Sequence, residues 1–96
     1  MIVLLNPTND PPKLALFEGQ SANLRFQVQD ATELSAINVY IDDKLFKILG
    51  ANVSGQEYAV SVGDTLSPGA HTLEIRATNV LRSRSTRIIM LDILAK

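Results

Sequence analysis

Few side chains in this 96-residue chain could carry out catalysis, and their spacing does not bring them together. Asp42 and Asp43 are adjacent acids, but neighbouring carboxylates in a tight turn point apart, and Asp is a favoured turn residue in its own right. His71 is the single histidine, and the positions of Ser83 and Ser85 do not suggest a nucleophile paired with it as a base. The chain has no cysteine, which excludes thiolate nucleophiles, disulfides and Cys-based metal sites. We therefore expect no catalytic residues and no cofactor, and we predict that the chain is not an enzyme.

The acids that could bind a metal ion are scattered along the chain. The segment Asn6–Pro12 is similar to the acidic, proline-containing linker of cadherin-like modules, and Asp10 and Asp30 would be the nearest calcium ligands. Calcium binds about six to eight oxygens from several groups, and the other acidic motifs of that family do not occur here. Pro is tolerated at sheet edges, so we interpret the segment as a bend that lets the first strand change sheets. We expect no metal site, with a weak calcium site as the open alternative.

The charge balance gives no reason to expect a polyanionic partner. Nine Lys and Arg residues against ten Asp and Glu residues leave a net charge of −1, so no general attraction to nucleic acid or to an anionic membrane follows. Arg82, Arg84 and Arg87 lie within six residues, but no aromatic residue separates them, as a nucleic-acid patch would ordinarily require. These arginines are either solvated or part of an interface with an acidic partner. Carbohydrate binding has weak support, because only Tyr40 has the outward parity of a stacking platform.

The N-terminal apolar run is too short for a targeting segment. Met1–Leu5 is followed by Asn6-Pro7, whereas a secretory signal needs about 7–15 apolar residues and a membrane helix about 20. We expect neither, and no membrane insertion. Two origins stay open, a complete protein that needs no signal or a module of a longer exported chain. Asn52-Val53-Ser54 matches a glycosylation sequon, without a secretion signal to support it.

Apolar and polar residues alternate along most of the chain, which is the pattern of half-buried β-strands. The alternating residues assigned to the core are Leu24, Phe26, Val28, Ile37, Val39, Ile41, Phe46, Ile48, Tyr58, Val60, Val62, Leu73, Ile75, Ala77, Ile89, Leu91 and Ile93. We expect five of these to be fully buried, namely Leu24, Phe26, Val39, Ile75 and Leu91. Gly and Pro residues fall between the runs, and Asp42-Asp43 predicts a two-residue hairpin turn. The pattern predicts an antiparallel sandwich or barrel, because a parallel sheet would need crossover helices.

Three segments resemble bacterial and phage immunoglobulin-like modules, which are similar in architecture to fibronectin type III domains. Leu24–Asp30 is similar to their strand B, and Ala36–Asp43 is similar to strand C with its following turn. Leu66-Ser-Pro-Gly-Ala-His-Thr-Leu73 resembles their E–F corner. The resemblance implies an all-β immunoglobulin-like antiparallel β-sandwich of about seven strands. We expect a single domain, residues 1–96, with an N-terminal strand and proline-rich bend at 1–12 and a sandwich body at 13–96.

The single histidine belongs to the corner segment. His71 has the same strand parity as Leu73 and Ile75, so it should point inward at the rim of the core. We expect its ring to be hydrogen-bonded within the fold, with a pH-sensing role as the alternative.

The first and last strands are apolar at both parities, in Ile2–Leu5 and Ile88–Leu91. An apolar sheet edge left open invites aggregation, so either the chain's own N-terminal segment or another subunit should cover it. Asp92 marks the outward parity, which Ile88 and Met90 share. We predict a protein interface on this terminal-strand edge. Its residues are Ile88, Met90, Arg84, Arg87, Val3 and Leu5.

Two kinds of function fit this sequence. The resemblance implies a non-enzymatic structural or attachment protein that acts through protein contacts in a larger assembly. A phage virion is such an assembly, with the chain as a decoration, capsid or tail component located in the virion. Its partners would be copies of itself or capsid and tail proteins. The alternative is a spacer or ligand-binding module from a bacterial cell-surface protein or an extracellular enzyme, located at the cell surface or secreted.

Overall fold

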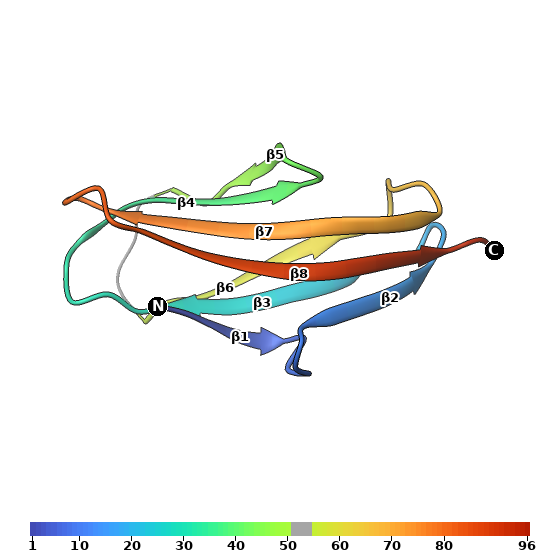
Figure 1. Ribbon diagram of the computed structural model, residues 1–96, viewed down its shortest axis with the longest axis horizontal. Helices are drawn as coiled ribbons and strands as arrows, with labels where there is room; N and C mark the ends of the chain where they lie inside the picture. Colours follow the sequence, from blue (N-terminus) through green and yellow to red (C-terminus); the bar gives the residue numbers. More distant parts are fainter. Residues whose placement is uncertain (51–54) are drawn as a thin grey trace.

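The computed structural model describes residues 1–50 and 55–96 and shows two packed β-sheets (Figure 1). The strands are β1 (Ile2–Asn6), β2 (Lys13–Phe17), β3 (Ala22–Val28), β4 (Leu34–Ile41), β5 (Lys44–Ile48), β6 (Glu57–Val62), β7 (Gly69–Asn79) and β8 (Arg84–Leu94). One sheet has the order β1-β3-β6 and the other has the order β2-β8-β7-β4-β5. The predicted all-β sandwich is confirmed. No helix in the described residues is long and apolar enough to cross a membrane.

The proline-rich bend moves the chain from one sheet to the other, as predicted. β1 pairs antiparallel with β3 in the three-stranded sheet, whereas β2 pairs with β8 in the five-stranded sheet. The β2–β8 pair is parallel, with Lys13 opposite Met90 and Phe17 opposite Leu94. The N-terminal region therefore forms two strands in place of one, and a parallel pair occurs in a sandwich that was expected to be antiparallel throughout.

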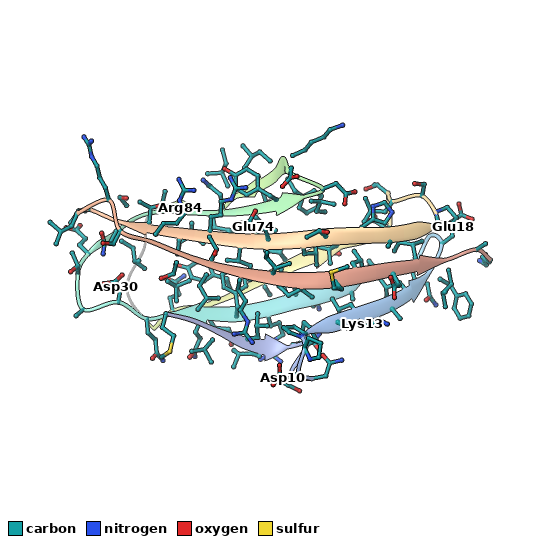
Figure 2. The ribbon with its side chains drawn as sticks, viewed as in Figure 1. Asp10, Lys13, Glu18, Asp30, Glu74 and Arg84 are labelled. Carbon is teal, nitrogen blue, oxygen red and sulfur yellow. The ribbon has the colours of Figure 1, made fainter. Side chains whose placement is uncertain are left out.

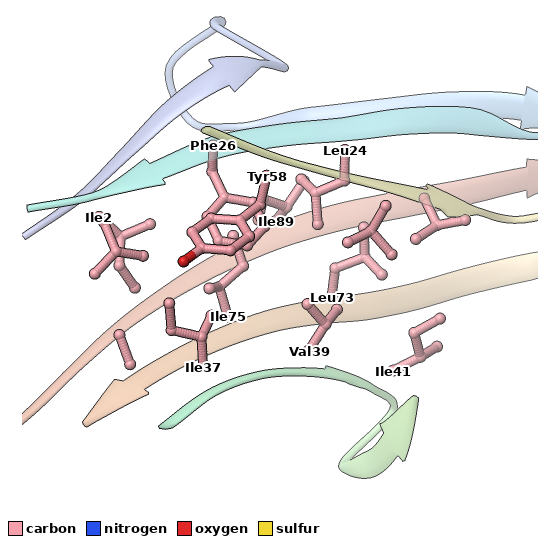
Figure 3. Close-up of a cluster of buried hydrophobic side chains, with 14 of the residues drawn as sticks. Ile2, Leu24, Phe26, Ile37, Val39, Ile41, Tyr58, Leu73, Ile75 and Ile89 are labelled. Atoms are coloured by element: carbon pink, nitrogen blue, oxygen red, sulfur yellow. The ribbon is translucent and has the colours of Figure 1, made fainter. Parts of the chain in front are cut away.

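The core lies between the two sheets (Figure 3). All five residues expected to be fully buried are so, namely Leu24, Phe26, Val39, Ile75 and Leu91. The rings of Phe26 and Tyr58, which come from paired strands of the three-stranded sheet, stack with centroids 5.5 Å apart. Gly63 closes one end of this core with a φ of 109°. A Cβ at Gly63 would lie 2.5 Å from Leu16 Cδ1, so β2 packs against bare backbone there.

Two of the residues assigned to the core from the alternating pattern are exposed. Phe46 is 39% exposed and Ile48 is 66% exposed. Both lie on β5, which is the outermost strand of the wider sheet and pairs only with β4. Ile48 lies opposite Asn38, which points away from the core, and Phe46 falls at the register shift in the β4–β5 pairing, so neither side chain enters the core. The hairpin that joins β4 to β5 at Asp42-Asp43 forms as predicted.

Candidate protein-interaction surface

The outer face of the five-stranded sheet carries the central pair of the predicted contact residues. On β8 the inward side chains of Ile89 and Leu91 are fully buried, and the alternate side chains point away from the core. Ile88 is 54% exposed and Met90 is 42% exposed. This is the orientation that the sequence predicted for Ile88 and Met90. Their role in an interface stays a prediction.

The first and last strands do not form the single edge that was expected. β8 lies inside its sheet between β7 and β2, and β1 belongs to the other sheet. Val3 and Leu5, both half-buried on β1, therefore do not share a face with Ile88 and Met90. The expectation was wrong because the bend transfers residues 13–17 to β8, where they cover part of the strand that was predicted to be open.

The two predicted interface arginines lie on opposite faces of β8. Arg84 is opposite Thr78 and has the outward parity of Ile88. Arg87 is opposite the buried Ile75, so it projects from the inner face of the sheet. It lines a hollow of about 290 Å³ that is otherwise formed by Ile2–Leu4 and Pro7–Asn9. Grouping the two arginines was wrong because positions three apart on a strand face opposite ways.

A polar cluster lies beside the exposed apolar residues of β8. Arg76 Nη2 donates a hydrogen bond to Glu74 Oε1 at 2.7 Å, and its Cζ lies 3.9 Å from the centroid of the Tyr40 ring. The hydrogen bond to the Glu74 carboxylate raises the pKa of Arg76 above its ordinary value. Because this guanidinium covers one face of Tyr40, the ring does not offer that face to a sugar.

Phe17 and Leu94 extend the apolar surface and were not predicted from the sequence. They are directly opposite each other on β2 and β8, and both are about half exposed on the outer face. Lys13 Nζ and Asp92 Oδ2, 3.2 Å apart, lie between them and Met90. The alternation of Leu14 and Leu16 with Lys13, Ala15 and Phe17 is the signal that could have identified this strand. We call Ile88, Met90, Leu94 and Phe17 the β8 patch.

His71 is held at the rim of the core, as predicted. Its Nδ1 lies 2.6 Å from Asp42 Oδ2, and its Nε2 lies 2.7 Å from the carbonyl oxygen of Ser67. Both partners are acceptors, so the ring satisfies them fully only when both nitrogens carry hydrogen. The hydrogen bond to Asp42 raises the pKa of His71, and the same bond lowers the pKa of Asp42. Asp42 Oδ1 also accepts the backbone N–H of Thr72 at 3.0 Å, so this acid orders the hairpin.

The candidate calcium ligands do not meet. Asp10 lies on the proline-rich bend and Asp30 lies in the segment after β3, well apart along the molecule (Figure 2). Asp30 Oδ1 accepts the backbone N–H of Thr32 at 2.8 Å, and its Oδ2 accepts the amide of Asn79 at 3.3 Å. In residues 1–50 and 55–96, no cluster of three or more acids or histidines could hold a metal. The sequon Asn52-Val53-Ser54 lies outside the described residues.

Comparison with known proteins identifies the architecture. No protein-family model and no curated protein sequence matches the chain. A solved structure of Clostridium thermocellum CbhA fibronectin(III)-like modules superimposes with a TM-score of 0.65, covering 99% of this chain and 98% of that chain at 13% identity. The fold is that of a fibronectin type III-like module.

A second solved structure shares this fibronectin type III-like fold over part of its length. A Jonesia denitrificans lytic polysaccharide monooxygenase aligns with a TM-score of 0.54 at 16% identity, over 88% of this chain and 58% of that chain. At such identities the likeness concerns the fold alone, because one fold hosts many unrelated functions. The function of this module therefore has to be argued from its own surface.

Proposed function

We propose that this fibronectin type III-like module is non-catalytic and acts through protein–protein contacts in a larger assembly, with the β8 patch as its contact surface. Isolated exposed apolar residues are ordinary on protein surfaces, but Ile88 and Met90 are successive outward residues of a strand inside the sheet. The proposal rests on this pair of neighbouring exposed apolar side chains. The ion pair of Arg76 with Glu74 borders Ile88 and supplies a polar rim, and the ion pair of Lys13 with Asp92 lies within the patch between Met90 and Leu94.

The energy available from the patch suits a contact that is repeated many times. Full burial of one such side chain contributes about 1.5–3 kcal/mol, so covering a half-exposed one contributes about 1 kcal/mol. A few such side chains give a weak single contact, and avidity strengthens it when many copies act together. A phage virion, with this chain as a decoration, capsid or tail component, is the assembly that we propose on this ground.

A spacer or ligand-binding module is the second candidate function. Its support is the likeness to the CbhA fibronectin(III)-like modules over nearly the whole of both chains. In that case the chain would be part of a bacterial cell-surface protein or an extracellular enzyme, and the β8 patch would contact a neighbouring domain. The mass of the native protein in its source cells separates the two candidates. A band at 10.5 kDa supports the assembly subunit, and a larger band supports the spacer.

The variant Ile88→Ser/Met90→Ser tests the contact surface. Gradient sedimentation of extracts from source cells measures whether the tagged chain migrates with a larger particle. We expect the wild type to do so and the variant to sediment as a free, folded chain. Val80→Ser/Leu81→Ser is the matched control, because both side chains are exposed in the turn before β8. Particle association of the Ile88→Ser/Met90→Ser variant at the wild-type level would contradict the proposal, and loss of folding would show that these side chains stabilise the sheet itself.

A further inference from the structure

Half of β8 has an open edge. Within the described residues, β2 pairs only with Met90–Leu94, so Arg84–Ile89 are paired with β7 on one side and with no strand on the other. Figure 1 shows β2 beside only the C-terminal part of β8. An open edge of six residues is about 20 Å long. It is the length of an ordinary strand.

The backbone groups of this edge point outward in a regular order. Met90 donates its N–H to the carbonyl oxygen of Pro12, and Leu94 accepts the N–H of Glu18, so the even-numbered residues of β8 face the β2 side. Hydrogen-bonding direction alternates along a strand. Thr86 and Ile88 therefore present their N–H and C=O groups to the open edge, whereas Arg87 and Ile89 bond to β7.

The hollow lies on the inner side of the same edge. Ile2–Leu4 and Pro7 provide apolar walls, and Arg87 provides a positive charge. Among residues 1–50 and 55–96, no carboxylate forms an ion pair with Arg82, Arg84 or Arg87. An added strand at this edge would direct every second side chain into the hollow.

The charges indicate what kind of strand fits. Self-pairing of two copies through this edge would bring Arg84 and Arg87 of both copies together, and these like charges repel. The chain's own first strand is already paired with β3. An acidic side chain would pair with Arg87, and apolar side chains on the same face of the added strand would contact Ile2–Leu4.

We propose that the open edge of β8 binds an extended segment of another protein as an added strand, with an acidic side chain against Arg87 and an apolar side chain on each side of it in the hollow. Backbone hydrogen bonds to Thr86 and Ile88 provide affinity, and the hollow provides specificity, as in other cases of strand addition. The hollow lies on the inner face and the side chains of the β8 patch lie on the outer face, so Ile88 contributes its backbone to the edge and its side chain to the patch. The proposal does not depend on the patch side chains.

The probe is the peptide acetyl-Thr-Val-Thr-Glu-Thr-Val-Thr-amide, whose Val and Glu side chains share one face of an extended strand. NMR titration of the labelled chain should show shifts at Arg84–Ile89 and Ile2–Leu4, and the amides of Thr86 and Ile88 should become protected from exchange. The same peptide with Gln in place of Glu should bind about threefold more weakly, because the Gln amide oxygen can still accept from the exposed Arg87 guanidinium but carries no opposite charge.

Variants of the chain assign the contact. Arg87→Gln should bring the Glu and Gln peptides to equal affinity, since the charge partner is gone. Thr86→Pro should abolish binding by removing an edge N–H that β7 does not use, whereas the matched control Thr86→Ala should bind normally. Phe17→Ser/Leu94→Ser removes patch side chains that are remote from the open edge and should bind the peptide within about twofold of the wild type, which separates this proposal from the proposed function.

Several results would overturn the proposal. These are no detectable binding of the Glu peptide at millimolar concentration, equal binding of both peptides by the wild type, and shifts confined to the outer face or to β5. Protection of Thr86 and Ile88 without peptide, in step with dimerisation measured by sedimentation, would assign the edge to a second copy of the chain.

Discussion

His71 and Asp42 form a pair whose contribution to stability depends on pH. His71 has a folded-state pKa above its ordinary 6.5, because Asp42 and the Ser67 carbonyl both accept from its ring. The contribution of His71 to the free energy of unfolding is therefore complete below pH 6.5 and is lost as the pH rises through its raised pKa. Asp42 has a folded-state pKa below its ordinary 3.8. The contribution of Asp42 to the free energy of unfolding is complete above pH 3.8 and is lost as the pH falls through its lowered pKa.

We predict that Asp42→Asn destabilises the chain at pH 5.5 and much less at pH 9. The variant keeps an acceptor for Thr72 but removes the charge that pairs with the imidazolium, and this pairing is lost as the pH rises through the raised pKa of His71. Because Asp42 is partly exposed, the loss at pH 5.5 should be about 0.5–1 kcal/mol. Urea denaturation at the two pH values measures it. Asp43→Asn, in the same turn but away from His71, is the control and should show no pH dependence. An equal loss at both pH values would assign the effect to the turn.

For single residues the sequence is informative, because successive side chains of a strand point to alternate faces of the sheet. It placed His71 at the inner rim and Ile88 and Met90 on the outside. It could not pair His71 with Asp42, since that contact joins a hairpin to a strand 29 residues later. The sequence could have shown that Arg84 and Arg87 lie on opposite faces, because side chains three positions apart on a strand point to opposite sides of the sheet.

The β4–β5 hairpin turn has two non-glycine residues at positive φ, Asp42 at 51° and Asp43 at 66°. A two-residue turn with both values positive matches the right-handed twist of the flanking strands, and the second position favours Gly. A change of Asp42 to Gly would remove its contacts to His71 and Thr72. Among the described residues, Asp43 makes no such side-chain contact. A substitution at Asp43 can therefore relieve the strain of its positive φ.

We predict that Asp43→Gly stabilises the chain by about 0.5 kcal/mol. Relief of the left-handed conformation contributes about 1 kcal/mol, and the greater freedom of Gly in the unfolded chain offsets about half of it. Chemical denaturation measures the difference. Asp64→Gly serves as the control, because Asp64 is a turn residue without positive φ, and it should be neutral or destabilising. A loss of stability in Asp43→Gly would show that the carboxylate has a role of its own.

Two elements were misjudged from the sequence because local alternation does not fix how a strand pairs with its neighbour. Alternation shows that a strand has two different faces, but it does not show which face the pairing turns toward the core. In β5 it led to the burial assigned to Phe46 and Ile48, although Ile48 is paired with the outward Asn38 and Phe46 lies at a register shift. In β2 the short run between Pro12 and Gly19 was taken as part of the sandwich body with no strand assigned, so the exposed Phe17 was missed.

For the molecule as a whole, the sandwich architecture followed from the sequence because many short alternating runs and turn residues all indicate it. The arrangement of strands within each sheet did not follow. Which strand neighbours β8 depends on long-range pairing, and the parallel β2–β8 pair has no local signature. The open half-edge of β8 and the hollow beside Arg87 are products of that pairing, so neither could be predicted.

The parallel β2–β8 pair also decides how this molecule should resist mechanical force. When Met1 and Lys96 are pulled apart, β1 is loaded first against β3, and once β1 has detached, tension acts on the N-terminal end of β2 and the C-terminal end of β8. Because the strands are parallel, the two loads act in opposite directions along one ladder, and the bonds over Lys13–Phe17 are sheared together instead of opening one by one.

We predict a lower unfolding force for Leu14→Pro than for Ala15→Pro in single-molecule stretching. The N–H of Glu18 bonds to β8, so by alternation that of Leu14 does too, whereas that of Ala15 faces the outer edge. Equal forces for the two variants would mean that the load bypasses this ladder. In a tandem array, the five residue pairs of the β2–β8 ladder would bear the load in every link once β1 has detached.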